Sequence, residues 1–171
     1  MNGYEFYPED GSTLYEEEAW ELSEQARSLW LRLNFAGEYS EGMSPIQIQG
    51  RKYLPMFPAR DGVYTIEQVR EKFLAVFSKE FTDKTLNAAI ASKDLLEYSG
   101  NVYAAYRKNR GKTSYNSWAD HVRDDGAGKF TVVMGVSMPP GGSTVYVELP
   151  TEKNAAGKFV FTDYPYWDRS E

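Results

Sequence analysis

Apolar residues in the first part of the chain recur at intervals of three and four, which places them on one face of a helix. This stripe consists of Ala19, Leu22, Ala26, Leu29 and Leu33. Thr13 and Glu16 match a capping box, in which a hydroxyl and a carboxylate bind the free backbone N–H groups at a helix start. Gly37 stands where a helix commonly ends. The pattern therefore predicts a first helix that begins near Thr13 and ends before Gly37.

The pattern between residues 46 and 94 predicts one strand followed by two shorter helices. Residues 46–57 are expected to form one extended strand, with a turn at 58–62. Thr65 and Gln68 form a second capping box. The helix that follows should have about three turns, and its stripe consists of Ile66, Val69, Phe73, Val76 and Phe77. A short third helix is expected with Thr82 as its cap, and its buried residues would be Leu86, Ala89 and Ile90.

From Leu95 onward the pattern changes to strand-like alternation, with glycine-containing turns between segments rich in Tyr, Val, Phe and Thr. The predicted strands are residues 95–98, 102–108, 113–123, 129–138, 143–150 and 158–167. Because the connections are short, neighbouring strands should be antiparallel. Helices followed by a β-meander predict an α+β fold, in which N-terminal helices pack on a curved antiparallel sheet. We expect a single domain over residues 13–171, preceded by a flexible spacer at residues 1–12.

The composition argues against several classes of function. The 171 residues include one histidine and no cysteine. Zinc, copper, iron–sulfur and thiol-nucleophile sites need clustered imidazole or thiolate groups, so none of them is expected. Neither a metal nor another cofactor is predicted. No segment stays apolar over the roughly 20 residues that a bilayer-spanning helix needs, so no membrane span is expected.

The negative charge is concentrated in the N-terminal segment. The chain has a formal net charge of −6, and residues 1–41 hold ten acidic and two basic residues. An acidic protein repels a phosphate backbone, so nucleic acid is not an expected partner. A contrary signal is the basic group Arg107, Lys108, Arg110 and Lys112, which has Tyr103, Tyr106 and Tyr115 nearby. We interpret this group as a solvated hairpin turn that protects an edge strand.

His121 is the candidate general base, because an imidazole can transfer protons near neutral pH. Its neighbour Asp120 should point to the opposite face, since successive strand residues alternate. A catalytic pair would then need a carboxylate from elsewhere, such as Glu148 or Asp163. A surface histidine is the simpler interpretation, and no catalytic residue is predicted. Residues 124–128 lack the terminal Glu of a calcium loop and are expected to form a hairpin turn.

Aromatic residues make up 15% of the chain, and Tyr and Trp suit both pockets and recognition surfaces. Candidates for lining a pocket between sheet and helices are Tyr53, Tyr103, Tyr146, Tyr166 and Trp167. Candidates for contacting a partner lie around His121 and in a proline-containing turn. They are Tyr115, Trp118, Asp120, His121, Arg123, Asp124, Asp125, Pro139 and Pro140. Ordinary packing within the sheet is the alternative role of the aromatic residues.

The order of the predicted elements resembles a known fold. A long helix and a strand precede a helix entry at residues 63–69 and its exit at 76–82, and a meander then ends in an aromatic strand with Tyr166 and Trp167. This order resembles the cystatin-like and nuclear-transport-factor-2-like cone folds. More narrowly, it resembles the bacterial inhibitors of cell-wall DL-endopeptidases, which are small exported proteins. The resemblance covers residues 60–168 and assigns no inhibitory residue to this chain.

The resemblance implies a non-enzymatic binding module, extracytoplasmic or secreted, whose protein partner is a peptidoglycan hydrolase. Inhibition would be steric occlusion of the enzyme's cleft by the aromatic sheet face and hairpin loops. The N-terminus is acidic where a signal peptide would be basic and then apolar, so we expect no signal peptide in these residues, and a cytoplasmic location is the alternative. The competing function is a small-molecule-binding or acid–base enzyme of the isomerase or dehydratase kind, with a pocket between the sheet and the helices.

Overall fold

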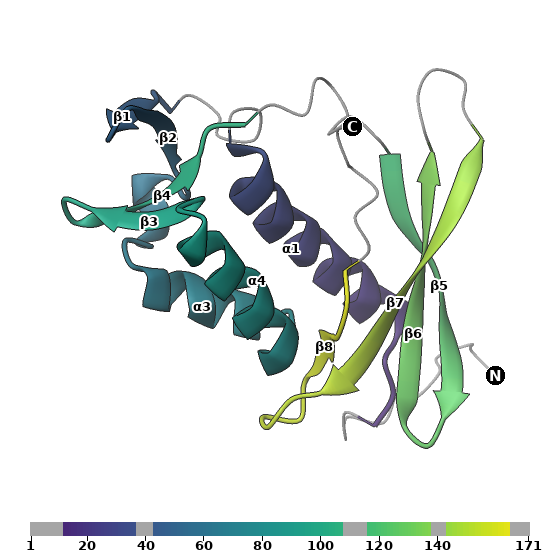
Figure 1. The fold of residues 1–171 in the computed structure, drawn as a ribbon. Helices are drawn as coiled ribbons and strands as arrows, with labels where there is room; N and C mark the ends of the chain where they lie inside the picture. The colour runs from purple at the N-terminus through teal and green to yellow at the C-terminus, as the bar shows by residue number, and fades with distance from the viewer. Residues whose placement is uncertain (1–11, 37–42, 108–115, 138–142, 165–171) are drawn as a thin grey trace.

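A computed structural model describes residues 12–36, 43–107, 116–137 and 143–164 (Figure 1). Within these ranges the helices are α1 (Glu16–Asn34), α3 (Ile66–Leu74) and α4 (Lys79–Ala91), with a 3-10 helix η1 (Ala59–Asp61). The first sheet has the order β1-β2-β4-β3 and consists of β1 (Ile46–Ile48), β2 (Arg51–Pro55), β3 (Leu95–Tyr98) and β4 (Asn101–Ala105). The second sheet has the order β5-β6-β7-β8 and consists of β5 (Asn116–Gly126), β6 (Lys129–Ser137), β7 (Thr144–Lys153) and β8 (Phe159–Phe161).

Helix α1 lies between the two sheets and contacts both β4 and β5 (Figure 1). Its predicted stripe is correct, because Ala19, Ala26, Leu29 and Leu33 are buried and Leu22 packs against them. The same core cluster contains Leu54 and Val102 of the first sheet and Val132 and Leu149 of the second. One apolar core therefore joins the buried side of α1 to both sheets, and the predicted α+β class with antiparallel strands is confirmed.

The predicted meander is divided into two sheets. Strand β4 pairs with β3 on one edge and with β2 on the other, where Tyr53 lies opposite Ala105. A strand has only two edges, so β4 offers none to β5, which begins the second sheet. The strands predicted at 102–108 and 113–123 lie next to each other in the chain but belong to different sheets. Part of each, together with 165–167 of the last predicted strand, falls outside the described residues.

The strand predicted at residues 46–57 is in fact a hairpin. Gln49 and Gly50 have φ of 51° and 79°, and they reverse the chain between β1 and β2. A two-residue hairpin turn needs positive φ at both positions, which glycine adopts at no steric cost. The sequence Gln49-Gly50 was the available signal for this turn.

Of the three predicted helix N-caps, one is present in the structure and two are not. The capping box at Thr65 and Gln68 is present, so that prediction is confirmed. The box predicted at Thr13 is wrong, since α1 begins at Glu16 after Tyr15, which makes no side-chain cap. Thr82 is also wrong as a cap: Ser78 accepts from the Phe81 N–H and starts α4, and Thr82 is buried inside that helix.

A short segment after α3 joins the helices to the second sheet. The helix ends at Leu74, and Val76 and Phe77 of the predicted stripe lie beyond it but remain buried. Phe77 forms an isolated parallel bridge with Phe161 of β8. The Phe161 N–H donates to the Val76 carbonyl at 2.8 Å, and the Ser78 N–H donates to the Phe161 carbonyl at 2.8 Å. The helices and the second sheet are therefore held together by both backbone hydrogen bonds and ring packing.

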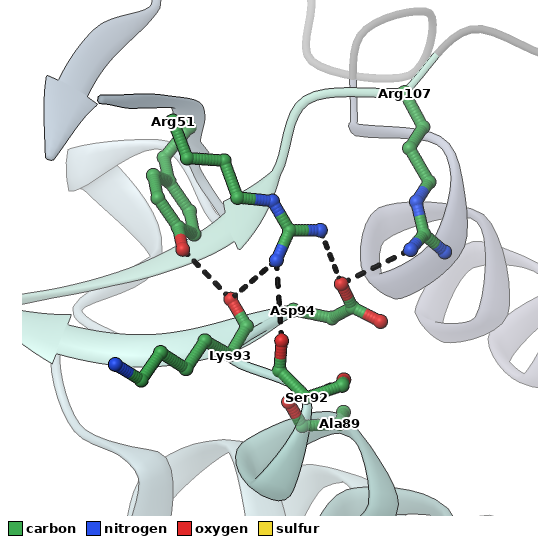
Figure 2. A network of polar contacts seen from close by, with 7 residues as sticks. Arg51, Ala89, Ser92, Lys93, Asp94 and Arg107 are labelled. Carbon is green, nitrogen blue, oxygen red and sulfur yellow. Dashed lines mark hydrogen bonds and ion pairs between the residues drawn. The ribbon is translucent and has the colours of Figure 1, made fainter. Parts of the chain in front are cut away.

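The C-terminal end of α4 is tied to the first sheet by a polar network (Figure 2). Arg51 of β2 donates to the carbonyl oxygens of Ser92 and Lys93 and forms an ion pair with Asp94. Arg107 donates to the same Asp94 oxygen at 3.0 Å. Cations at a helix C-terminus are favourable because the free carbonyls there carry partial negative charge. Partial burial opposes ionisation of Asp94, but the hydrogen bond from Arg51 and the other nearby donors and charges hold its pKa below the usual value.

Candidate functional site

Strands β5, β6 and β7 present a surface that no described helix covers, on the side away from α1 (Figure 1). Cross-strand register defines its rows, because residues opposite one another share a face. One row is Trp118, Gly135 and Tyr146; the next is His121, Val133 and Glu148; the third is Arg123, Thr131 and Pro150. The alternate row of Val122, Val132 and Leu149 packs into the core. We call this surface the outer face and define it by Trp118, Asp120, His121, Arg123, Asp125, Tyr146 and Glu148.

Trp118 lies against the backbone of Gly135. A Cβ atom built on Gly135 would come within 2.4 Å of two carbons of the indole ring. Any larger residue at position 135 would lift the ring off the sheet. The neighbouring Tyr146 is 62% exposed. The glycine thus lets a large aromatic ring lie close to the strand beside a second, more exposed one.

Asp120 and His121 form a pair, contrary to the prediction that they face opposite sides. The register with β6 shifts between Ala119 and His121, so Asp120 is the extra residue of a β-bulge. A bulge redirects a side chain, and here both residues reach the outer face. His121 Nδ1 lies 2.8 Å from Asp120 Oδ2, and Trp118 Nε1 donates to the other carboxylate oxygen at 3.4 Å. These hydrogen bonds, that of His121 first, lower the pKa of Asp120.

A second bulge supplies a second carboxylate to the outer face. The register shifts again between Asp124 and Gly126, which leaves Asp125 as the extra residue. Asp125 accepts from the Thr131 hydroxyl at 2.5 Å and from Arg123 Nε at 2.7 Å. These bonds lower the pKa of Asp125. Arg123 also forms an ion pair with Glu148, and the hydrogen bonds that it donates to Asp125 and Glu148 raise its pKa.

The two carboxylates proposed as partners for His121 are engaged elsewhere. Glu148 pairs with Arg123, and Asp163 accepts from the N–H of Tyr164. Of the carboxylates of Asp120, Glu148 and Asp163, only that of Asp120 contacts the His121 ring. Its ring is half exposed, and it lines neither of the two clefts described below.

The other predicted partner residues do not all lie on the outer face. Asp124 belongs to the end of the β5–β6 hairpin, where its carboxylate accepts from the Gly126 N–H. Tyr115, Pro139 and Pro140 lie outside the described residues.

The predicted pocket residues are not brought to one cavity. Tyr53 is 2% exposed, and its hydroxyl donates to the Lys93 carbonyl at 2.8 Å. Tyr103 packs with it in a small apolar cluster on the first sheet. Tyr146 stands on the outer face of the second sheet, and Tyr166 and Trp167 lie outside the described residues. None of the three described tyrosines lines either cleft below.

Two adjoining clefts follow helix α1, and the sequence did not predict them. The larger, about 530 Å³, lies against the end of α3 and is lined by Leu29, Phe57, Val76, Glu24, Asp61 and Lys72 among others. The smaller, about 300 Å³, lies toward the N-terminal end of α1 and is lined by Leu14, Leu22, Phe159, Glu18, Glu21 and Lys158 among others. Gln25 and Ala75 line both clefts. We call the two together the α1 groove.

One part of the α1 groove was visible in the sequence. Glu18, Glu21 and Glu24 recur every third residue, which places them along one side of a helix. Lys72 and Lys158, on the facing side, come from distant parts of the chain. Their approach to α1 depends on the tertiary fold, so no sequence signal marks it.

The described residues offer no candidate metal centre, since they contain no group of three acidic or histidine side chains placed to hold an ion. Within the same ranges, no helix combines the length and the apolarity needed to cross a bilayer. No protein-family model matches the chain, and no curated protein matches it either.

Proposed function

We propose that this protein is a non-enzymatic binding module that docks on another protein through the outer face. The observation that carries the proposal is the row of Trp118, Gly135 and Tyr146, in which an indole ring covers the backbone of a buried glycine and a second aromatic side chain, 62% exposed, stands beside it. Tryptophan, tyrosine and arginine are the residues that most often dominate the energy of protein interfaces. All three types stand together on this face.

The polar side chains of the outer face already pair with one another in the free protein. Arg123 is held by Asp125 and Glu148, and His121 is held by Asp120. Binding to a surface that is already ordered costs less conformational entropy. Val133, at the centre of the face, is only 7% exposed although it belongs to neither core cluster, which indicates that the surrounding side chains form a close layer.

The partner we propose is an extracytoplasmic peptidoglycan hydrolase of the DL-endopeptidase type. The resemblance of residues 60–168 to inhibitors of these enzymes supports this choice. Inhibition by steric occlusion requires a rigid surface that fits the enzyme's cleft, and it requires no reactive group. An antiparallel sheet packed on a helix is such a rigid support.

A second candidate, an acid–base enzyme, is favoured by the Asp120–His121 pair. A carboxylate that accepts from Nδ1 leaves Nε2 of a neutral ring able to take up a proton. General-base chemistry also needs a cavity that orients a substrate. Neither cleft of the α1 groove includes the pair, so the binding module is the better-supported proposal.

The test is to titrate the full chain into a peptidoglycan DL-endopeptidase and to measure cleavage of stem peptides. We expect cleavage to be suppressed near a one-to-one ratio. Tyr146→Ala should weaken inhibition by about tenfold or more, because an exposed interface aromatic loses its contact area. Tyr98→Ala is the matched control: Tyr98 is 52% exposed but lies on β3 of the other sheet, so its loss should change nothing.

Two results would contradict the proposal. Unchanged cleavage at a molar excess of the protein would remove the inhibitor function. Equal losses from Tyr146→Ala and Tyr98→Ala would remove the outer face as the docking surface. Loss of a hydrolytic or isomerase activity in His121→Ala would instead favour the enzyme candidate.

A further inference from the structure

Strand β7 has one free edge over its first half. β6 pairs with one edge of β7 from residue 144 onward, whereas β8 pairs with the other edge only at residues 151–153 (Figure 1). After β8 the chain leaves this edge, because Tyr164 is buried in the core, where its ring centroid lies 5.7 Å from that of Phe77. Within the described ranges, no strand therefore covers the second edge of residues 144–149. We call this edge of residues 144–149 the β7 edge.

Main-chain hydrogen-bonding groups point out of the β7 edge. The N–H and the carbonyl of one strand residue point to the same edge, and successive residues alternate between the two edges. The Pro150 carbonyl accepts from the Thr162 N–H on the β8 side. The main-chain groups of Thr144, Tyr146 and Glu148 share this direction, because β7 has no bulge between residues 144 and 150. In the part of the chain that the structure describes, these groups have no main-chain partner.

The opposite edge of the same sheet is protected, but the β7 edge is not. β5 has two bulges and is rich in ionisable residues from Asp120 to Asp125. Bulges and charges are means by which proteins prevent an edge strand from pairing with another chain. Residues 144–149 have no bulge, no proline, no glycine and only one charged residue. Val145 and Tyr146 are also 39% and 62% exposed. An unprotected edge with exposed apolar side chains is suited to pairing with a further strand.

A second copy of the same strand matches the β7 edge in antiparallel register. When Tyr146 faces Tyr146 of the second copy, Thr144 faces Glu148 and Val145 faces Val147. The facing pairs with outward main-chain groups would then form about six backbone hydrogen bonds. The two Glu148 carboxylates are kept apart, and the valines meet as cross-strand pairs, which stabilise a sheet. The side chains of the edge are therefore complementary to themselves.

This register is favoured over its nearest alternative. A shift by two residues would place Tyr146 opposite Glu148 and Thr144 opposite Pro150. The Pro150 carbonyl already accepts from Thr162, and proline has no N–H to donate. The shifted register would therefore lose the hydrogen bonds of its outermost pairs.

We propose that the β7 edge pairs with the β7 edge of a second copy, so that the second sheets of two molecules join into one continuous antiparallel sheet. Tyr146 lies at the centre of the pairing. Because residues opposite one another share a face, the two outer faces lie side by side in this dimer. The pairing uses only the strand edge and leaves both faces of the sheet open, so it does not depend on the function proposed for the outer face. The shared segment is short, so we expect a dimer that forms only as the protein concentration rises.

The first test is sedimentation equilibrium of the full chain at concentrations up to millimolar, which should show a monomer–dimer equilibrium. Val145→Lys should raise the dissociation constant by about tenfold or more, because the lysine would lie among the paired valines. Ile90→Lys is the matched control: Ile90 is also 39% exposed but lies on α4, so this variant should dimerise normally. Circular dichroism of each variant verifies that it is folded.

The second test uses single cysteines, since the chain has none of its own. Two facing Tyr146 residues would have Cα atoms about 5.5 Å apart, which is within the range of a disulfide. Tyr146→Cys should therefore form a disulfide-linked dimer under mild oxidation. Glu148→Cys is the control on the same strand, because the two cysteines would be offset by about 13 Å along the sheet. It should remain largely unlinked, but it should link to Thr144→Cys when the two variants are mixed.

Hydrogen exchange separates the second copy from other occupants of the β7 edge. We expect the amides of Tyr146 and Glu148 to exchange more slowly as the protein concentration rises. A monomer in which these amides are protected at every concentration would mean that the chain covers its own edge, and this would overturn the proposal. A monomer in which they exchange rapidly at every concentration would overturn it as well, and would leave the edge open for a strand of another protein.

Two further results would contradict the proposed pairing. Equal effects of Val145→Lys and Ile90→Lys on the dissociation constant would place the contact between copies elsewhere. Equal linking of Tyr146→Cys and Glu148→Cys would show that the copies do not meet in this register. Neither result affects the inhibition test of the outer face, which measures cleavage of stem peptides and not association of the protein with itself.

Discussion

Gly135 and Trp118 depend on each other at the scale of single residues. The indole ring occupies the space that a Cβ atom at position 135 would need. Gly135 is also not among the glycines with positive φ, so its requirement is for space and not for backbone conformation. We therefore expect Gly135→Ala to displace Trp118 and to lower the free energy of unfolding by about 1 kcal/mol. Urea unfolding followed by circular dichroism measures this change.

The same substitution in the Trp118→Ala background is the control. Removing the indole ring removes the three closest contacts of the new methyl group, and alanine restricts the unfolded chain more than glycine does. Gly135→Ala should then be neutral or slightly stabilising. If Gly135→Ala lowers the free energy of unfolding equally in the Trp118→Ala background, the strain comes from the backbone and not from Trp118.

At the scale of elements, the two predicted capping boxes give opposite expectations. Thr65 accepts from the Gln68 N–H at 3.1 Å, so Thr65→Ala should destabilise the protein by about 1 kcal/mol. Thr13 makes no such contact with α1, and Thr13→Ala should cost less than about 0.5 kcal/mol. Denaturant unfolding of the two variants compares them directly. Similar losses would mean that Thr13 caps α1 in solution.

The network that ties α4 to the first sheet should make stability depend on pH. The pKa of Asp94 is lower in the folded protein than the ordinary 3.8. A depressed folded pKa contributes stability that is present above the unfolded pKa and is lost as pH falls through the folded pKa. We expect Asp94→Asn to lower Tm at neutral pH, and we expect this difference to shrink below about pH 4. A difference in Tm that stays constant into the acid range would contradict the role given to Arg51 and Arg107.

At the scale of the whole molecule, Phe77 and Phe161 join the helices to the second sheet. Their ring centroids lie 6.5 Å apart, and their backbones form the parallel bridge. Phe77→Leu and Phe161→Leu should each cost about 1 to 2 kcal/mol, and their combined effect should differ measurably from the sum. Ile48→Val belongs to the separate cluster of the first sheet, so its effect should add to that of Phe161→Leu. If the effects of Phe77→Leu and Phe161→Leu also add, as those of Ile48→Val and Phe161→Leu should, then the two phenylalanines are not energetically coupled.

Features that depend on neighbouring residues in the chain could be predicted from the sequence, and features that depend on distant residues could not. The apolar stripe of α1, the cap at Thr65 and the antiparallel pairing of β3 with β4 and of β5 through β8 depend on neighbours in the chain, and they were predicted correctly. The pairing of Asp120 with His121 was missed because a bulge inserts one residue into β5, and strict alternation has no signal for it. The lysines of the α1 groove were missed because they meet α1 only after folding.

The sequence by itself determined the α+β class, the apolar stripe of α1 and the change from helices to antiparallel strands, because hydrophobic period and turn chemistry are local properties. Only the tertiary structure decided that the strands divide into two sheets around α1, since β4 pairs on both edges and one of its partners precedes it by about 50 residues. The outer face and the α1 groove follow from that division. Both consist of side chains brought together by long-range pairing and packing, which a linear pattern does not encode.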